Sequence, residues 1–214
     1  MKKNLVSLNL IVDMSGSMAP VKNDTINGIN GFLEEQRSLP GDAVLTLCLF
    51  NSVYDLLHES VPVKSVPNLT DKDYHPNGWT ALLDAIGKTI ESTEKKIEEM
   101  KDEDRPEKVL FMIITDGEEN ASSKFKVEKI KEMVVKHQQL DVYPWEFVFV
   151  GASSIDAFSI GSSIGVASSN AICYESTSRG TGVLFESVTK GVSNYRGTSE
   201  KFDVVYTQNL INKS

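Results

Sequence analysis

Residues 5–18 read LVSLNLIVDMSGSM, a largely apolar run that stops abruptly on a carboxylate and two hydroxyls. The part at 5–12 is apolar enough to be covered on both faces, which is typical of a strand in a parallel sheet. Asp13, Ser15 and Ser17 then follow at every second residue. Three oxygen-bearing side chains in such a position either cap the next helix or form part of a binding site.

The same change from apolar to polar recurs farther along the chain. Residues 109–114, VLFMII, form the clearest buried strand in the sequence, and Thr115, Asp116 and Gly117 follow immediately. Further strand patterns occupy 43–50, 53–63, 145–150 and 171–174, and they alternate with helical patterns at 20–39, 80–100, 126–140, 155–164 and 182–195. This alternation predicts an open, doubly wound α/β fold with helices on both faces of a mostly parallel sheet.

One strand is expected to run the other way. The tight turn at Asn51 and Ser52 joins 43–50 to 53–63, so 53–63 should be an antiparallel edge strand. The polar stretch 64–79 has no periodicity and is expected to be an ordered surface loop. We assign residues 1–196 to one domain and 197–214 to a C-terminal extension, in which 202–206 either forms a strand or does not.

Composition narrows the classes of partner. The 30 acidic and 22 basic residues give a net charge of −8, which disfavours binding to nucleic acid or to an anionic membrane. Cys48 and Cys173 lie in apolar runs without a CxxC motif, so we expect free core thiols and a reducing compartment. The basic and apolar start imitates a signal peptide, but the apolar run is short and meets Asp13. We therefore expect a cytoplasmic protein.

The two interrupted strands point to one site. If they lie side by side, Asp13, Ser15, Ser17 and Asp116 gather at the carboxyl edge of the sheet, where open α/β folds bind ligands. These hard oxygen donors suit Mg²⁺, with Mn²⁺ and Ca²⁺ as alternatives. Taken singly, Ser17 and Thr80 could be helix caps, and Asp116 with Gly117 a turn. A carboxylate that closely follows a buried apolar strand occurs twice, at Asp13 and at Asp116. This repetition favours a metal site over separate caps and turns.

Three separated segments resemble the von Willebrand factor type A domain. They are DMSGS at 13–17, GWTAL at 78–82 and ITDG at 114–117, and the resemblance covers about residues 4–195. It implies that these segments form a metal-ion-dependent adhesion site. The hydroxyls of Ser15, Ser17 and Thr80 would touch the metal, whereas Asp13 and Asp116 would act largely through waters or hydrogen bonds.

The resemblance also implies a function without catalysis. We expect a Mg²⁺-dependent protein-binding module whose partner offers an Asp or Glu to the metal, monomeric on its own, from the cytoplasm of a bacterium or its virus. Glu118, Glu119 and Asn120 follow Asp116 and should add negative charge at the rim, which would weaken an acidic partner or hold a basic one. Trp79 either contacts the partner or packs a loop.

Other classes stay open. The metal could merely rivet the loops of a structural subunit, or Asp13 could be the nucleophile of a Mg²⁺-dependent phosphohydrolase. The second acid of that chemistry is missing, because Ser15 occupies its place. Residues 161–165, GSSIG, match the GxSxG pattern of serine hydrolases, but no strand precedes Ser163 and no histidine follows it. The three histidines, His58, His75 and His137, show no metal-ligand spacing.

Overall fold

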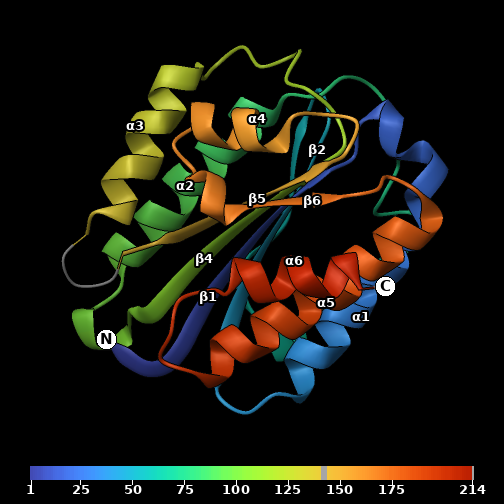
Figure 1. The fold of residues 1–214 in the computed structure, drawn as a ribbon. Coiled ribbons are helices and arrows are strands. Elements are labelled where there is room, and N and C mark those ends of the chain that lie inside the picture. Colours follow the sequence, from blue (N-terminus) through green and yellow to red (C-terminus); the bar gives the residue numbers. More distant parts are fainter. Residues whose placement is uncertain (141–143, 214) are drawn as a thin grey trace.

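A six-stranded sheet runs through the middle of the molecule (Figure 1). The computed structural model describes residues 1–140 and 144–213. The strand order is β3-β2-β1-β4-β5-β6, and only β3 is antiparallel to its neighbour. The strands are β1 (Lys2–Asp13), β2 (Asp42–Phe50), β3 (Tyr54–Pro62), β4 (Pro106–Thr115), β5 (Glu146–Ala152) and β6 (Ala171–Tyr174). The predicted fold class, with its antiparallel edge strand, is confirmed.

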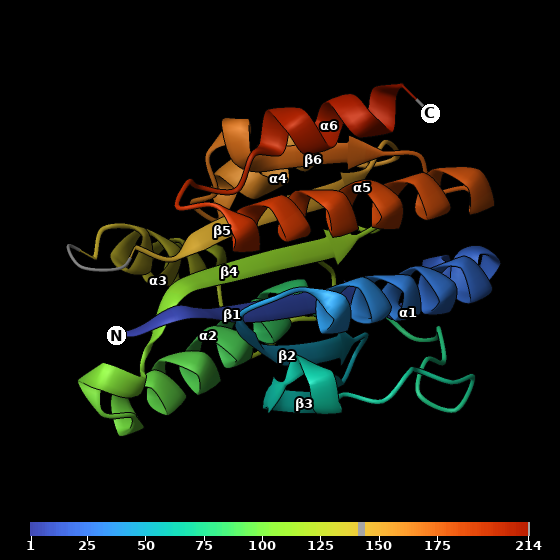
Figure 2. The same cartoon turned by 90° about the horizontal axis from the view of Figure 1, so that it is seen from below.

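Helices cover both faces of the sheet (Figures 1 and 2). One layer contains α1 (Lys22–Ser38), α5 (Ser178–Gly197) and α6 (Val204–Asn212), and the other contains α2 (Leu82–Glu99), α3 (Val127–Gln138) and α4 (Ala157–Ser163). Side chains of a strand alternate between its two faces, so Leu10 and Val12 pack in the first layer's core and Ile11 in the second. This double burial explains why the central strands are almost continuously apolar.

The central position of β1 decides where the site lies. β1 pairs in parallel with both β2 and β4, and Val12 lies opposite Ile114 of β4. The carboxyl ends of β1 and β4 therefore meet at one edge of the sheet. Beyond β1, the chain turns into a short 3-10 helix, η1 (Gly16–Val21), before α1 begins.

The stretch after β3 is more than a surface loop. It begins with a 3-10 turn, η2 (Val63–Ser65), and then places Val66, Leu69 and Tyr74 in the core. Tyr74 is fully buried, and its hydroxyl donates a 2.6 Å hydrogen bond to the carbonyl oxygen of Asp13. The expectation of a surface loop over 64–79 is thus only partly correct. Isolated apolar residues can pack in the core even where the sequence shows no helix or strand periodicity. The Tyr74 hydrogen bond therefore joins this loop to the end of β1.

The C-terminal extension packs onto the same core as the rest of the chain. Phe202 and Val204 are buried, and residues 204–206, which the sequence allowed as a strand, are the first turn of α6. The Gln208 side chain exchanges two hydrogen bonds, of 2.9 and 3.1 Å, with the backbone of Cys173 on the edge strand β6. α6 thereby occupies backbone groups that another strand could pair with. Ser214, the last residue of the extension, lies outside the described residues.

Both cysteines have free thiols. Cys48 is buried as expected, whereas Cys173 is partly exposed because it lies on an edge strand. Among the helices of the described residues, none combines the length and the apolar character needed to cross a bilayer.

Candidate metal centre

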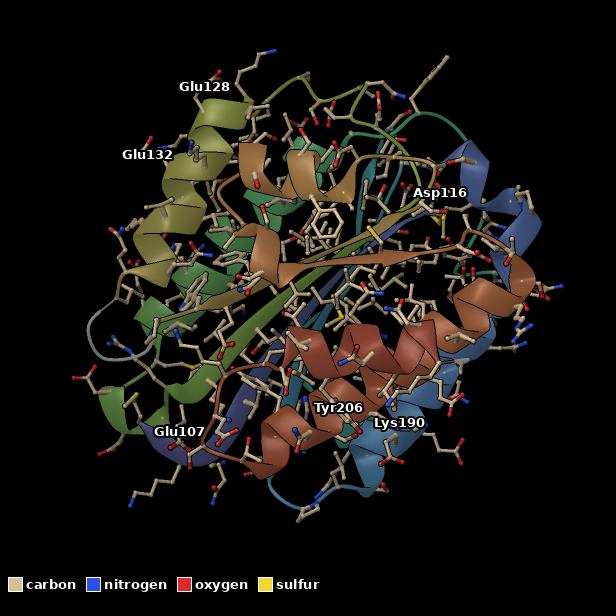
Figure 3. All side chains as sticks on the ribbon, viewed as in Figure 1. Glu107, Asp116, Glu128, Glu132, Lys190 and Tyr206 are labelled. Carbon is tan, nitrogen blue, oxygen red and sulfur yellow. The ribbon has the colours of Figure 1, made fainter. Side chains whose placement is uncertain are left out.

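The five residues singled out in the sequence lie at the carboxyl edge of the sheet. Asp13 ends β1, Ser15 and Ser17 follow in the turn and η1, Asp116 follows β4, and Thr80 precedes α2. Figure 3 labels Asp116 at this end of the sheet. The Ser17 hydroxyl donates a 2.6 Å hydrogen bond to Asp116 Oδ1 and lies 3.1 Å from the Ser15 hydroxyl. Segments about a hundred positions apart in the chain are therefore in direct contact.

Gly117 shows how closely the oxygen atoms converge. A methyl group on its Cα would lie 3.2 Å from Thr80 Oγ1, 3.7 Å from Ser17 Oγ and 3.9 Å from Asp13 Oδ2. Oxygens of the first two segments thus lie around one small volume beside Gly117, and Asp116 of the third segment is bonded to Ser17. The absence of a side chain at position 117 keeps this volume free.

The helix-cap interpretation of the hydroxyls is wrong. The N-cap of η1 is Ser15, whose side chain makes no capping bond, and the N-cap of α2 is Ala81. The Ser17 hydroxyl instead reaches across to Asp116. Ser17 and Thr80 are therefore positioned for the cluster and not for the helix that follows each of them.

Asp13 is held firmly and is fully buried. Its Oδ1 accepts a 2.7 Å hydrogen bond from the backbone N–H of Ser15, and its Oδ2 accepts a 2.5 Å bond from the Thr115 hydroxyl. Burial raises the pKa of the Asp13 carboxyl, these hydrogen bonds oppose the rise, and the negative charge of Asp116 adds to it. A positive ion beside the two acids would offset this cost, because it favours their charged forms.

Residues around the site fix the segment that follows Asp116. Asn120 accepts a 2.8 Å hydrogen bond from the Thr80 N–H through its side chain and donates a 3.0 Å bond from its own N–H to the Thr80 carbonyl. Glu119 accepts bonds from the N–H groups of Leu83, Ala121 and Ser122, so it lies at the N-terminus of α2, where a negative charge is favourable.

The sequence interpretation of Glu119 and Asn120 as rim charges is therefore corrected. Asn120 carries no charge, and the Glu119 carboxylate accepts hydrogen bonds from backbone N–H groups, so Glu118 alone of the three is an exposed carboxylate. Thr115, Ser176 and Asn120 were missed as supporting residues. Thr115 carried a weak signal, because it is a hydroxyl at the end of an otherwise apolar strand. Ser176 donates a 3.3 Å hydrogen bond to Asp116 Oδ2 from a loop that no local pattern connects to the site.

Two residues that the sequence offers for metal binding or catalysis, His137 and Ser163, have structural roles away from the candidate metal centre. The His137 ring stacks on Trp145 with ring centres 3.8 Å apart, and burial lowers its pKa. Ser163 is the last residue of α4 and donates to the Ile160 carbonyl, so it does not follow a strand as the nucleophile of a serine hydrolase does. Over the part of the chain that the structure describes, no group of three or more His, Cys, Asp or Glu side chains could hold a metal ion.

The donor set nevertheless fits a hard divalent cation. It combines two carboxylates with three hydroxyls, and it contains neither imidazole nor thiolate. Oxygen-only sites with few carboxylates are typical of Mg²⁺, which keeps several of its waters when bound. Neutral hydroxyl ligands leave much of the charge of such a cation uncompensated, so it retains affinity for an outside carboxylate.

Comparisons with known proteins agree with the fold. No sequence model of a protein family matches the chain, and no curated protein does. Among solved structures, proximal thread matrix protein 1 from the mussel byssus matches with a TM-score of 0.59 and 13% identity, over 87% of this chain and 45% of that one. A von Willebrand factor type A protein from Catenulispora acidiphila matches with a TM-score of 0.56 and 11% identity, over 88% and 42%.

The hypothetical protein BatB from Bacteroides thetaiotaomicron matches with a TM-score of 0.53 and 11% identity, over 90% of this chain and all of that one. The chain thus spans less than half of the mussel and Catenulispora proteins. At these identities the likeness shows the fold alone, which is that of von Willebrand type A domains. One form of the mussel protein has a zinc-occupied metal-ion-dependent adhesion site motif.

Substitution of Gly117 by alanine is expected to weaken cation binding at least about tenfold, a loss of about 1.4 kcal/mol. The added methyl group would lie 3.2 Å from Thr80 Oγ1, inside the volume that the site oxygens surround. Isothermal titration with Mn²⁺ measures the change. Gly197→Ala is the matched control, because a methyl group there meets no atom within 4 Å. Equal affinity of Gly117→Ala and wild type would show that the cation does not occupy this volume.

Proposed function

We propose that this chain is a non-enzymatic module that binds a partner protein through a divalent cation, Mg²⁺ in the cell. Ser15, Ser17 and Thr80 would hold the cation directly, and Asp13 and Asp116 would support it through hydrogen bonds and waters. A carboxylate of the partner, from Asp or Glu, would complete the coordination. The free cysteines are consistent with a cytoplasmic setting, which is part of the proposal.

One observation carries this proposal: hydroxyl and carboxylate oxygens from three distant segments converge on the volume in front of Gly117. A hydroxyl cluster of this kind has no role in capping the adjacent helices. Its oxygens instead match the preferences of a hard cation. The von Willebrand type A fold supports the same function as a protein-interaction module.

The two rival functions are less well supported. Asp13 is fully buried, and both of its carboxylate oxygens accept hydrogen bonds, so it is poorly placed to attack a phosphoryl group. A metal with a purely structural role would contribute little to holding the loops together. The loops are already joined by protein contacts such as Asn120 with Thr80 and Ser17 with Asp116.

Affinity purification from cells of the source organism tests the proposal. The bait is wild type, Thr80→Val or Thr80→Ser, each with Mg²⁺ or with EDTA. Valine has the shape of threonine but no hydroxyl, whereas serine retains the hydroxyl. The same partner should be recovered by wild type and Thr80→Ser in Mg²⁺ only, and not by Thr80→Val. Circular dichroism should show that all three proteins stay folded in EDTA.

Two results would count against the proposal. Recovery of partners that depends neither on Mg²⁺ nor on Thr80 would refute a metal-mediated contact. Unfolding of the wild type on removal of the metal would instead favour the structural rivet.

A further inference from the structure

Two large apolar side chains are exposed beside the candidate metal centre. Val53 and Trp79 are 67% and 68% exposed, and we call this pair the apolar rim. Trp79 directly precedes Thr80, so the indole is attached to the same loop as a proposed metal ligand. The interpretation of Trp79 as a loop-packing residue is therefore wrong. An exposed tryptophan is costly to keep in water, and this residue type is enriched where partners bind.

The backbone of the apolar rim is held rigidly. Gly78 has φ +70°, a conformation that suits glycine, and its carbonyl accepts a 3.2 Å hydrogen bond from the N–H of Gly16. The N–H of Trp79 donates a 2.9 Å bond to the Ser52 hydroxyl, and the N–H of Ala81 donates a 2.8 Å bond to the Asn51 carbonyl.

The Val53 loop is closed in the same way. The N–H of Val53 donates a 2.8 Å bond to Asn51 Oδ1, and the N–H of Asn51 donates a 3.1 Å bond to the Val53 carbonyl. The loops that carry Val53 and Trp79 are thus joined to each other and, through Gly78, to Gly16 between Ser15 and Ser17. Little backbone entropy would be lost when a partner covers such a preorganised surface.

We propose that the apolar rim is the second half of the partner site and selects a segment in which a large apolar residue lies within about three positions of the metal-bound Asp or Glu. This inference rests on the proposed function and specifies the class of partner. The cation would fix the acidic residue, and Trp79 with Val53 would cover the neighbouring apolar side chain. The carboxylate would supply the metal dependence and the apolar residue most of the selectivity.

A peptide library tests this directly. Ten-residue peptides with one fixed central Asp and random neighbours are selected on immobilised wild type in Mg²⁺ and read by sequencing. The same selection is run on Trp79→Ser, Thr80→Val and Val205→Ser. Val205 is the matched control, because it is 69% exposed but lies in the first turn of α6. This turn follows Phe202, whose N–H donates a hydrogen bond to Glu146 at the amino end of β5, so it lies at the edge of the sheet opposite the metal centre.

Wild type and Val205→Ser should enrich Leu, Ile, Phe or Trp near the Asp. Trp79→Ser should still bind in a Mg²⁺-dependent way but without this enrichment, and its affinity for a wild-type-selected peptide should fall at least about tenfold. The inference is overturned if wild type selects no apolar neighbours, if it selects basic ones, or if Trp79→Ser keeps the apolar preference.

The outcomes separate the two levels of the proposal. Mg²⁺-dependent selection that is lost in Thr80→Val but lacks an apolar preference would retain the proposed function and reject the apolar rim. Selection that ignores both Mg²⁺ and Thr80→Val would reject the proposed function and, with it, the inference.

Discussion

Asp116→Asn is expected to leave the metal-free protein at least as stable as the wild type and to abolish its stabilisation by Mg²⁺. Asp116 is buried, and its negative charge opposes ionisation of the fully buried Asp13, so neutralising it relieves repulsion when no cation is present. Asparagine retains the shape and an oxygen that can accept from Ser17. The substitution removes one of only two negative charges that would hold the cation.

Urea unfolding with Mg²⁺ and with EDTA measures both effects. A ligand at a hundred times its dissociation constant stabilises a folded protein by about 2.7 kcal/mol, and wild type should gain on this order. Asp116→Asn should gain less than about 0.5 kcal/mol under the same conditions. The control Asp104→Asn makes the same charge change at an exposed position and should behave as wild type. An equal Mg²⁺ effect in Asp116→Asn and wild type would place the cation elsewhere.

Asp84→Ala is expected to destabilise the protein by about 3 kcal/mol, because it leaves one buried and two partly buried backbone donors without their partners. Asp84 lies in the first turn of α2, and its carboxylate accepts hydrogen bonds of 2.8 to 3.1 Å from the N–H groups of Ser123, Lys124 and Phe125. It therefore holds the end of the loop that begins at Asp116. Thermal or urea unfolding measures the loss, with Asp102→Ala as the exposed control.

The pH dependence identifies the charged carboxylate as the cause. Burial would raise the pKa of Asp84, but the N–H donors of Phe125, Ser123 and Lys124 outweigh it and lower the pKa below the ordinary value. A carboxyl whose pKa is lowered by folding stabilises the folded state at pH values above its pKa in the unfolded chain, which is about 4. This contribution is lost as the pH falls through the lower pKa of the folded state. The stability difference between wild type and Asp84→Ala should therefore shrink below about pH 4. A difference that stays constant there would mean that the charge contributes nothing.

The fold could be predicted because its decisive signals are local. The buried runs 5–12 and 109–114 are too apolar for one-sided strands, and helical patterns follow both, so a parallel sheet covered on both faces was the consistent arrangement. The same reasoning placed Asp13 and Asp116 together, since adjacent parallel strands end at the same edge. Thr80 could be added only through its resemblance to a known motif, because its own helix gives no reason to associate it with β1.

The supporting residues could not be predicted, because their partners are distant in the chain. Asn120 binds the backbone of Thr80 forty positions away, and Tyr74 reaches the carbonyl of Asp13 from sixty-one positions away. No periodicity marks either contact. The sequence places Glu119 at the rim because it follows Asp116 closely, whereas in the structure its carboxylate accepts from the N–H of Leu83, one of the donors left unpaired at the start of α2.

Anomalous diffraction from crystals grown with Mn²⁺ tests the central claim most directly. We expect one strong peak in front of Gly117, within about 2.0–2.6 Å of the hydroxyl oxygens of Ser15, Ser17 and Thr80, the range in which Mg²⁺ and Ca²⁺ contact oxygen. Asp13 and Asp116 should lie behind these hydroxyls and reach the ion mainly through hydrogen bonds or waters. A map without a peak at this place, or with the peak on other residues, would contradict the proposal.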